Sequence, residues 1–197
     1  MKYKVERICN TMVDRLSQVE SVEAVTLHLA EETDLNDPYF FLSLDVYYRG
    51  ALPSASEREL FFEEAGGFET SLYSEKDRFF IEDIPIRVEY KHISRIEHLV
   101  EKLEDNLWAF RRTGTYMFYR LQEGTKLFSR TDWLDGIQGR LKQLPDTFWS
   151  MLARASTSTM EHYLIDMKAA NMEEDGFFYL ISSAGFIKSL ASSLFII

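Results

Sequence analysis

The spacing of apolar residues changes its period near residue 94, and this change limits what the chain can fold into. Before that point, apolar residues alternate with polar ones over short runs, as in strands that bury one face. After it, they recur every three or four residues, as in amphipathic helices. Mixed elements followed by a run of helices favour two joined units. We therefore expect an α+β protein, with a small mixed β-sheet flanked by helices over residues 1–95 and an α-helical bundle over residues 96–197.

The first half is predicted to begin with a helix and two strands. Apolar residues at three- and four-residue steps favour a helix over residues 3–19. Alternation and β-branched residues favour strands over residues 22–30 and 39–48, with a break at Asn36-Asp37-Pro38 between them.

Turn and cap residues predict the rest of this half. Pro53-Ser54-Ala-Ser-Glu57 has a capping serine and a carboxylate three residues later, so a helix is expected from there to Ala65, ended by Gly66-Gly67. Residues 78–91 are predicted to form a hairpin that turns at Glu82-Asp83, with Ile86 and Val88 on one face and Arg87 and Glu89 on the other. In the second half, helices are expected over residues 96–103, 108–121, 133–144, 146–169 and 177–197.

The composition excludes some classes of protein. The chain carries 22 Lys and Arg against 32 Asp and Glu, for a formal net charge of −10. Affinity for duplex nucleic acid comes largely from cations that neutralise phosphates, so this balance argues against duplex nucleic acid as a partner. The single cysteine, Cys9, excludes an internal disulfide and a zinc site of several thiolates, and it is expected to be a buried structural thiol. A reducing cytoplasm is the expected compartment.

The sequence predicts no membrane partner. Charges interrupt the N-terminal MKYKVERICNTMVDRL where a signal peptide needs its apolar core, and no stretch of about 18 uncharged apolar residues occurs. The other end stops in mid-pattern on two isoleucines without a capping residue. We expect the natural chain to continue beyond Ile197.

Asp45 and Glu89 are acids within strands that are otherwise hydrophobic. An acid in such a place is costly unless it faces water, a donor or a metal ion. Two carboxylates on neighbouring strands of a rigid sheet can hold a divalent cation for phosphoryl transfer. The alternative is that each acid lies on the solvent face of an amphipathic strand. His28, in the first strand, either points into the same cleft or packs as an ordinary strand residue.

Three motifs follow one another in a particular order. They are Leu44-Asp-Val-Tyr-Tyr-Arg-Gly-Ala-Leu-Pro-Ser54, then Ile86-Arg-Val-Glu-Tyr90 with a helix after it, then Phe118-Tyr-Arg-Leu-Gln-Glu-Gly124. With the order of elements, this resembles the DNA polymerase beta-like nucleotidyltransferase superfamily. The layout is similar to that of its small bacterial members, in which a minimal nucleotidyltransferase domain precedes a helical domain. The resemblance covers most of the chain and implies Mg²⁺-dependent transfer of a nucleoside monophosphate from an NTP to an acceptor.

The resemblance also implies site residues. In that superfamily a Gly-Ser pair after the first strand holds the nucleotide phosphates, and an Asp-x-Asp motif with a third acid binds two metal ions. Here the Gly-Ser position falls on Ala30-Glu31, the acid pair on Ser43 and Asp45, and the third acid on Glu89. An alternative alignment makes Asp45 the first acid and puts Tyr47 at the second position. Either alignment replaces one carboxylate ligand, and the Cβ and negative charge of Ala30-Glu31 work against triphosphate binding.

These departures leave different functions open. The first is a nucleotidyltransferase in which Asp45 and Glu89 are catalytic metal ligands. The missing ligand would then come from loop acids, which are Glu31, Glu32, Asp34 and Asp37. The second is a catalytically degenerate module that keeps the cleft to bind a ligand or a protein partner without a metal ion. The third is an interaction module whose long helices form a homodimer.

Overall fold

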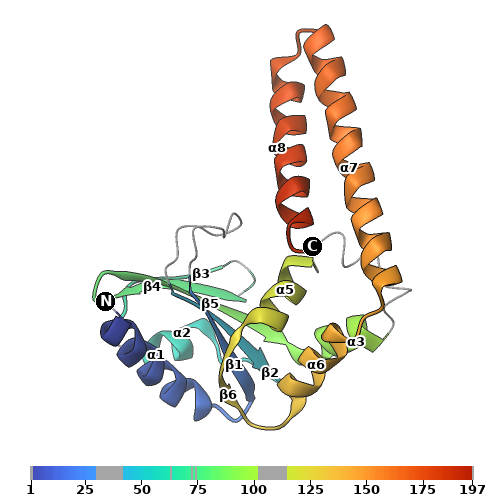
Figure 1. Ribbon diagram of the computed structural model, residues 1–197. Coiled ribbons are helices and arrows are strands. Elements are labelled where there is room, and N and C mark those ends of the chain that lie inside the picture. The colour runs from blue at the N-terminus through green and yellow to red at the C-terminus, as the bar shows by residue number, and fades with distance from the viewer. Residues whose placement is uncertain are drawn as a thin grey trace. The chain divides into compact units, whose positions relative to one another are not determined.

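The computed structural model describes residues 2–29, 42–62, 64–71, 73, 75–101 and 115–196. The chain divides into two compact units, the first made of residues 1–100 and 123–139 and the second of residues 101–122 and 140–197. Figure 1 shows the elements, which in chain order are α1 (Lys2–Ser17), β1 (Val22–Leu29), β2 (Leu42–Tyr48), α2 (Ala55–Phe61), β3 (Gly66–Thr70), β4 (Lys76–Ile81), β5 (Ile84–His92), α3 (Ile93–Glu101), α5 (Thr115–Glu123), β6 (Thr125–Ser129), α6 (Trp133–Lys142), α7 (Asp146–Met172) and α8 (Gly176–Ser193).

A six-stranded mixed sheet forms the centre of the first unit. Its strand order is β3-β4-β5-β2-β1-β6. β2 and β5 are parallel, and the other neighbouring strands are antiparallel. Helices accompany this sheet without the regular β-α alternation of a doubly wound fold, so the protein has the α+β fold that the sequence predicts.

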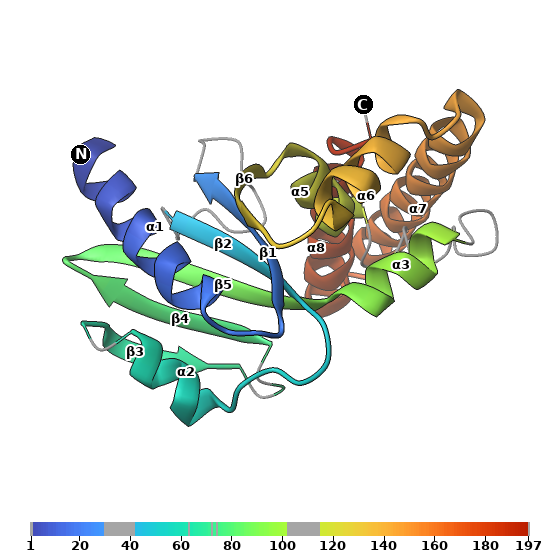
Figure 2. The ribbon, with the colours of Figure 1, turned by 90° about the horizontal axis from the view of Figure 1, so that it is seen from below.

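α1 and α2 lie on one face of the sheet and build the core (Figure 2). Ile8, Met12 and Leu16 share the buried side of α1, because steps of three and four residues place side chains on one helical face. They belong to one apolar cluster with Leu44 and Val46 of β2. Each large aliphatic side chain buried in this way stabilises the fold by roughly 1.5–3 kcal/mol. This apolar seam holds α1 on the sheet.

Cys9 lies on the same side of α1 and is buried, as the sequence predicts. Burial raises the pKa of its thiol to about 11. The thiol is therefore protonated at neutral pH, and it packs as a small apolar group rather than acting as a nucleophile.

The predicted cap and the predicted hairpin turn are confirmed. The Ser54 hydroxyl accepts a hydrogen bond from the Glu57 N–H at 3.3 Å, and the Ser54 N–H donates to Glu57 Oε2 at 2.7 Å. This reciprocal pair is a capping box, and it begins α2. The hairpin of β4 and β5 turns at Glu82 and Asp83, which both have positive φ angles of 48° and 66°. Two consecutive residues of this kind favour the tight type I′ turn of a two-residue hairpin.

The prediction for the end of α2 is wrong. The helix ends at Phe61 rather than at Ala65, because Phe62 leaves the helix and stacks on Phe79 with ring centroids 4.8 Å apart. Gly66 and Gly67, which were expected only to end this helix, have a second role. They begin strand β3, in which Gly67 takes a φ of 63° that favours glycine.

β6 contradicts the prediction that every element after residue 94 is helical. It pairs antiparallel with β1, with Thr125 opposite Leu27 and Ser129 opposite Ala24. The strand is short and only half-buried, so no clear alternation reveals it in the sequence. Its pairing returns residues 123–139 to the first compact unit. The division into domains at residues 95 and 96 stays a prediction.

The second unit contains a hairpin of the long helices α7 and α8, which lie side by side (Figure 1). Asp175 caps α8, because its Oδ1 accepts a hydrogen bond from the Phe178 N–H at 2.9 Å. After α8 the ring of Phe195 packs on Tyr116 and Tyr119 of α5, with centroids 5.1 and 4.6 Å apart. Within the described part of the chain, no helix combines the length and hydropathy that a membrane crossing requires.

Candidate functional site

The sheet face opposite α1 carries polar and charged side chains on its central strands. The period of two along β2 places Leu44 and Val46 in the core and Asp45 on the other side. β2 and β5 run parallel in a register that pairs Asp45 with Glu89. The structure thus brings together the two acids that the sequence singles out. We call this surface the charged face, and its members are His28, Ser43, Asp45, Lys76, Arg78, Arg87, Glu89 and Lys91.

Asp45 is fully buried, so its carboxylate needs compensation. The Nζ of Lys91 lies 2.5 Å from Asp45 Oδ2, and the Lys91 side chain is itself only 11% exposed. The Nε2 of His28 lies 3.6 Å from the same oxygen. Removing a carboxylate from water costs several kcal/mol unless an opposite charge lies close to it. Lys91 supplies that charge.

Cations surround Glu89 as well. Lys76 Nζ lies 2.6 Å from Glu89 Oε1, Lys91 Nζ lies 3.6 Å from Oε2, and Arg87 Nε lies 3.8 Å from Oε1. Burial by itself raises the pKa of Glu89. The attraction of the neighbouring cations, Lys91 first among them, outweighs burial and holds the pKa of Glu89 below its usual range. Glu89 is therefore ionised at neutral pH.

The ammonium group of Lys91 contacts both acids, at 2.5 Å from Asp45 Oδ2 and 3.6 Å from Glu89 Oε2. A divalent ion bound by this pair would lie in the same region, about 2.1 Å from each ligand oxygen. The ammonium group supplies one positive charge where such an ion would bring two, and Lys76 and Arg87 add further positive charge beside Glu89. The acid pair is thus compensated by a side chain of the protein.

Ser43, which the resemblance places in the acid pair, is bound to Arg87. The Nε of Arg87 donates a hydrogen bond to Ser43 Oγ at 2.9 Å, and both side chains are buried. The two residues are direct neighbours across β2 and β5. The Ser43 hydroxyl is therefore already bound by a buried guanidinium group.

The other predicted site residues, Ala30 and Glu31, lie outside the described residues, as do the loop acids. Among the residues that the structure describes, no group of three or more His, Cys, Asp and Glu side chains could hold a metal ion. The roles of Asp45 and Glu89 as catalytic metal ligands stay predictions.

Sequence reasoning that started from acids missed Lys91 and Lys76. A signal for Lys91 was present, because Arg87, Glu89 and Lys91 alternate along β5 and a period of two puts them on one face. A lysine two residues from an acid on one strand face predicts an ion pair as readily as a metal site. Lys76 comes from β4, and its place beside Glu89 depends on a strand register that only the structure gives.

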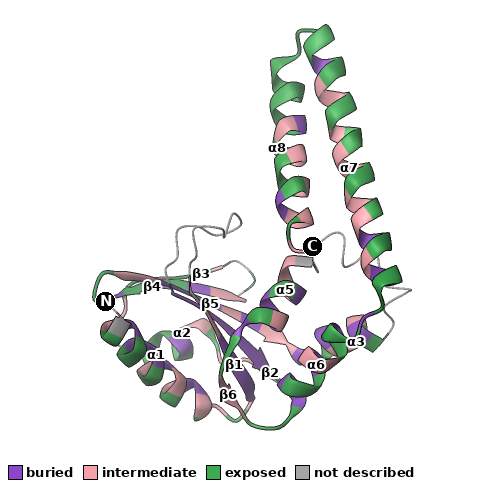
Figure 3. Cartoon of the chain, viewed as in Figure 1, coloured by how far each residue is buried: buried purple, intermediate pink, exposed green. Residues whose placement is uncertain are grey.

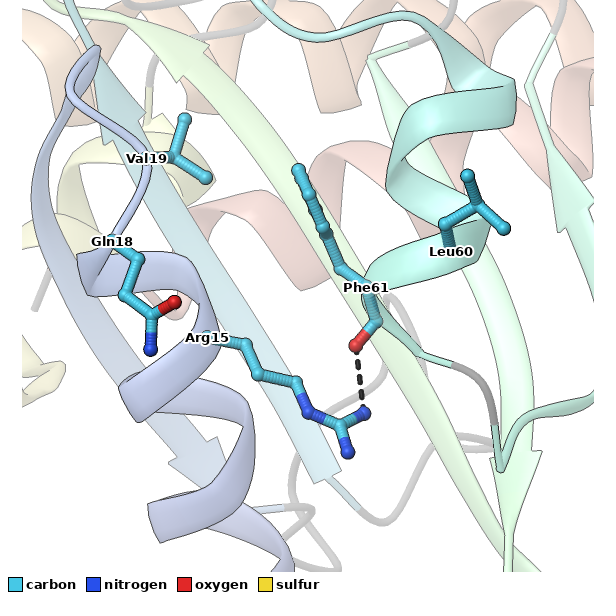
Figure 4. A pocket seen from close by; sticks show the side chains of 5 residues that line it. All are labelled: Arg15, Gln18, Val19, Leu60 and Phe61. Carbon is cyan, nitrogen blue, oxygen red and sulfur yellow. Dashed lines mark hydrogen bonds between the residues drawn. The ribbon is translucent and has the colours of Figure 1, made fainter.

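A pocket lies on the α1 side of the sheet, between the end of α1 and α2 (Figure 4). Its volume is about 540 Å³, and its lining residues are Arg15, Gln18, Val19, Leu60 and Phe61. Arg15 Nη1 donates hydrogen bonds to Phe61 O and Glu64 Oε2, both at 2.7 Å. The guanidinium group ties α1 to α2, and the lining offers no nucleophile and no carboxylate. We assign this pocket no catalytic role.

No protein-family model matches the sequence, and no curated protein matches it. Among solved structures, a nucleotidyltransferase-like protein from Exiguobacterium sibiricum is similar, with a TM-score of 0.46 and 13% sequence identity. The match covers 95% of this chain and 55% of that one, so this chain spans about half the length of the protein it matches. The likeness is loose.

The charged face is better suited to electrostatic binding than to proton transfer. A general base needs a pKa near the working pH, whereas Glu89 has a lowered pKa and cations on both of its oxygens. Asp45 is held by Lys91 and has no exposed surface. What the face presents in excess is positive charge, in a chain whose net charge is −10.

Proposed function

We propose that this chain is a catalytically degenerate nucleotidyltransferase-like protein, whose charged face binds an anionic, phosphate-bearing ligand without a metal ion. The resemblance of its sequence motifs supports the nucleotidyltransferase-like part. The observation that carries the proposal is the place of Lys91, whose Nζ lies 2.5 Å from Asp45 Oδ2 and 3.6 Å from Glu89 Oε2.

Electrostatics favours this reading over two-metal catalysis. Mg²⁺ binds through oxygen ligands that carry negative charge, and phosphoryl transfer depends on two such ions held in a strict geometry. Here Mg²⁺ would have to displace the Lys91 ammonium group from a buried carboxylate. The neighbouring Ser43 hydroxyl already accepts a hydrogen bond from Arg87. Metal binding would separate Lys91 from Asp45 and Arg87 from Ser43. Each separation would leave a buried cation without its partner, which is costly.

The same cations favour an anionic ligand. Arg78 of β4 is exposed and lies opposite the buried Arg87 in the strand register, next to the Lys76–Glu89 ion pair. Arginine forks bind phosphate oxygens through paired, charge-assisted hydrogen bonds. We therefore expect Arg78 to contact the ligand, with the cations buried beneath it adding to the local positive potential.

Calorimetric titration tests this proposal by measuring whether Mg²⁺ strengthens or weakens ligand binding. Purified protein is titrated with ATP, GTP, CTP, UTP and pyrophosphate, each in EDTA and in excess Mg²⁺. We expect at least one of these to bind in EDTA, and to bind equally or more weakly with Mg²⁺, since the ion neutralises phosphate charge. Arg78→Ala should weaken binding about ten- to hundredfold, the effect of one charge-assisted hydrogen bond.

Arg7→Ala is the matched control, because Arg7 is also exposed but lies on α1, on the other side of the sheet. It should leave the affinity unchanged. Binding that requires Mg²⁺ and is abolished by Asp45→Asn would overturn the proposal in favour of metal-dependent nucleotidyl transfer, with Asp45 and Glu89 as ligands. Absence of binding by every probe would overturn the assignment of an anionic ligand.

A further inference from the structure

α8 meets α7 through small side chains. A Cβ atom on Gly185 would lie 2.4 Å from Tyr163 Cε1, so the Tyr163 ring of α7 packs directly on the backbone of α8 there. Ser193 Oγ lies 2.8 Å from Ser156 Oγ across the same contact. Small residues at a helix contact allow the backbones to come close together. Gly185 and Ser193 are therefore small residues on the side of α8 that faces α7.

Many large apolar side chains of α8 are exposed, and exposed positions recur along the helix in Figure 3. Phe177, Leu180, Ile187 and Leu194 expose 74%, 67%, 64% and 55% of their surface. With Ala184 and Ala191 they follow steps of three and four residues, which is the heptad spacing of a coiled-coil seam. Ala191 in this row is buried. We call the exposed residues of the row, together with the adjacent Ile181, the α8 stripe, and its members are Phe177, Leu180, Ile181, Ala184, Ile187 and Leu194.

The α8 stripe is large and almost uncharged. Aromatic side chains bury roughly 150–250 Å² each and aliphatic ones less, so at these exposures the six residues of the stripe together offer on the order of 600 Å² of surface at most. That equals the largest patch of an ordinary monomer, at about 300–600 Å². Complete burial of two copies of the stripe would remove at most about 1200 Å² from water, which is the lower end of the range of stable interfaces. Lys188 is the single charged residue in the helix.

We propose that the α8 stripe binds the α8 stripe of a second copy of this chain, so that two α7–α8 hairpins form a four-helix bundle. A two-fold interface uses the same patch on both partners, which suits a surface that is apolar throughout. A distinct protein partner would be recognised by complementary charges around the patch. The helix offers only Lys188 for that purpose. This inference does not depend on the proposed ligand of the charged face.

Sedimentation equilibrium tests the proposal with a matched pair of variants. The wild-type chain is expected to sediment at twice its mass of 23.1 kDa over about 1 to 100 μM protein. Ile187→Glu places a charge in the middle of the stripe and should raise the dimer dissociation constant at least about tenfold. Leu180→Glu should do the same.

Ile165→Glu is the control, because Ile165 on α7 is 63% exposed, as much as Ile187. It lies two residues beyond Tyr163, which faces α8, so helical geometry puts it on the far side of α7. This variant should leave the dissociation constant unchanged within about twofold. Far-UV circular dichroism checks that each variant keeps its helices. A wild-type monomer over the whole concentration range would overturn the proposal, and so would equal effects of Ile187→Glu and Ile165→Glu.

Discussion

Arg58 donates two hydrogen bonds to Asp77, from Nε to Oδ2 at 2.8 Å and from Nη2 to Oδ1 at 2.9 Å. Both side chains are almost completely buried. Arg58 also donates to the carbonyl oxygen of Pro53 at 2.7 Å, and its guanidinium group lies 4.7 Å from the ring centroid of Tyr90. This ion pair joins α2 to β4 inside the core.

Asp77→Asn is expected to lower the free energy of unfolding by about 3–5 kcal/mol, because it leaves the charge of Arg58 buried without a counter-charge. Urea denaturation measures the loss. Arg15 and Glu64 provide the comparison, since they form the same two-bond contact at 2.7 and 2.6 Å in a more exposed place. Glu64→Gln should cost only about 0–1 kcal/mol. Similar losses for the two variants would contradict this account.

Asp45 and Lys91 are expected to be strongly coupled. Lys91→Met leaves the buried Asp45 carboxylate without its ammonium partner, and Asp45→Asn leaves Lys91 with only the longer contact to Glu89, so each should lower the free energy of unfolding by about 3 kcal/mol. The double variant should lose less than the sum of the single losses, with a coupling of about 1–3 kcal/mol. A double-mutant cycle by urea denaturation gives this number. Strict additivity would mean that Lys91 is held mainly by other groups.

Glu89 is expected to make stability depend on pH on the acid side. Its pKa is below the usual value in the folded protein and near about 4.3 in the unfolded chain. The unfolded chain therefore takes up the proton first, so the contribution of Glu89 is present above the unfolded pKa and is lost as pH falls through the folded one. Stability measured from pH 7 down to about 3 should fall less steeply for Glu89→Gln than for the wild type. Identical slopes would contradict the prediction.

Gly185→Ala is expected to loosen the α7–α8 hairpin. The added Cβ would overlap the ring of Tyr163, with Cε1 at 2.4 Å, and overpacking of this kind costs about 1–3 kcal/mol. Gly139→Ala in α6 is the control, since no atom lies within 4 Å of its added Cβ. It should be neutral or stabilise the protein by up to about 1 kcal/mol, because alanine favours a helix. Thermal unfolding followed by circular dichroism compares the two.

Periodicity and local turn chemistry were enough to predict much of the fold. The capping box at Ser54, the turn at Glu82-Asp83 and the long helices are each fixed by residues near one another in sequence. β3 and β6 could not be predicted in this way. Each is a short strand at a sheet edge with mostly exposed or half-exposed side chains, so it carries little alternation. Its strand conformation depends on a neighbour that the sequence does not reveal.

The candidate site, too, could be predicted from the sequence only in part. The sequence places Asp45 and Glu89 on sheet faces, and the parallel register sets them side by side. The positions of the two acids in the sequence did not predict that a lysine side chain contacts both of them. Lys91 comes from the same strand as Glu89 but reaches across to Asp45 on β2, and that cross-strand ion pair follows from side-chain geometry rather than from any motif.

During synthesis, β1 is completed long before β6, the strand that pairs with its outer edge. Residue 29 ends β1, but the strand that covers its free edge ends only at residue 129. At ribosomal rates of about 5–20 residues per second, synthesis of the intervening chain takes on the order of 5–20 s. Throughout that interval the growing chain holds an unpaired strand edge, which can pair with another nascent chain. Pairing of β6 with β1 closes this edge and thereby removes a site at which nascent chains could aggregate.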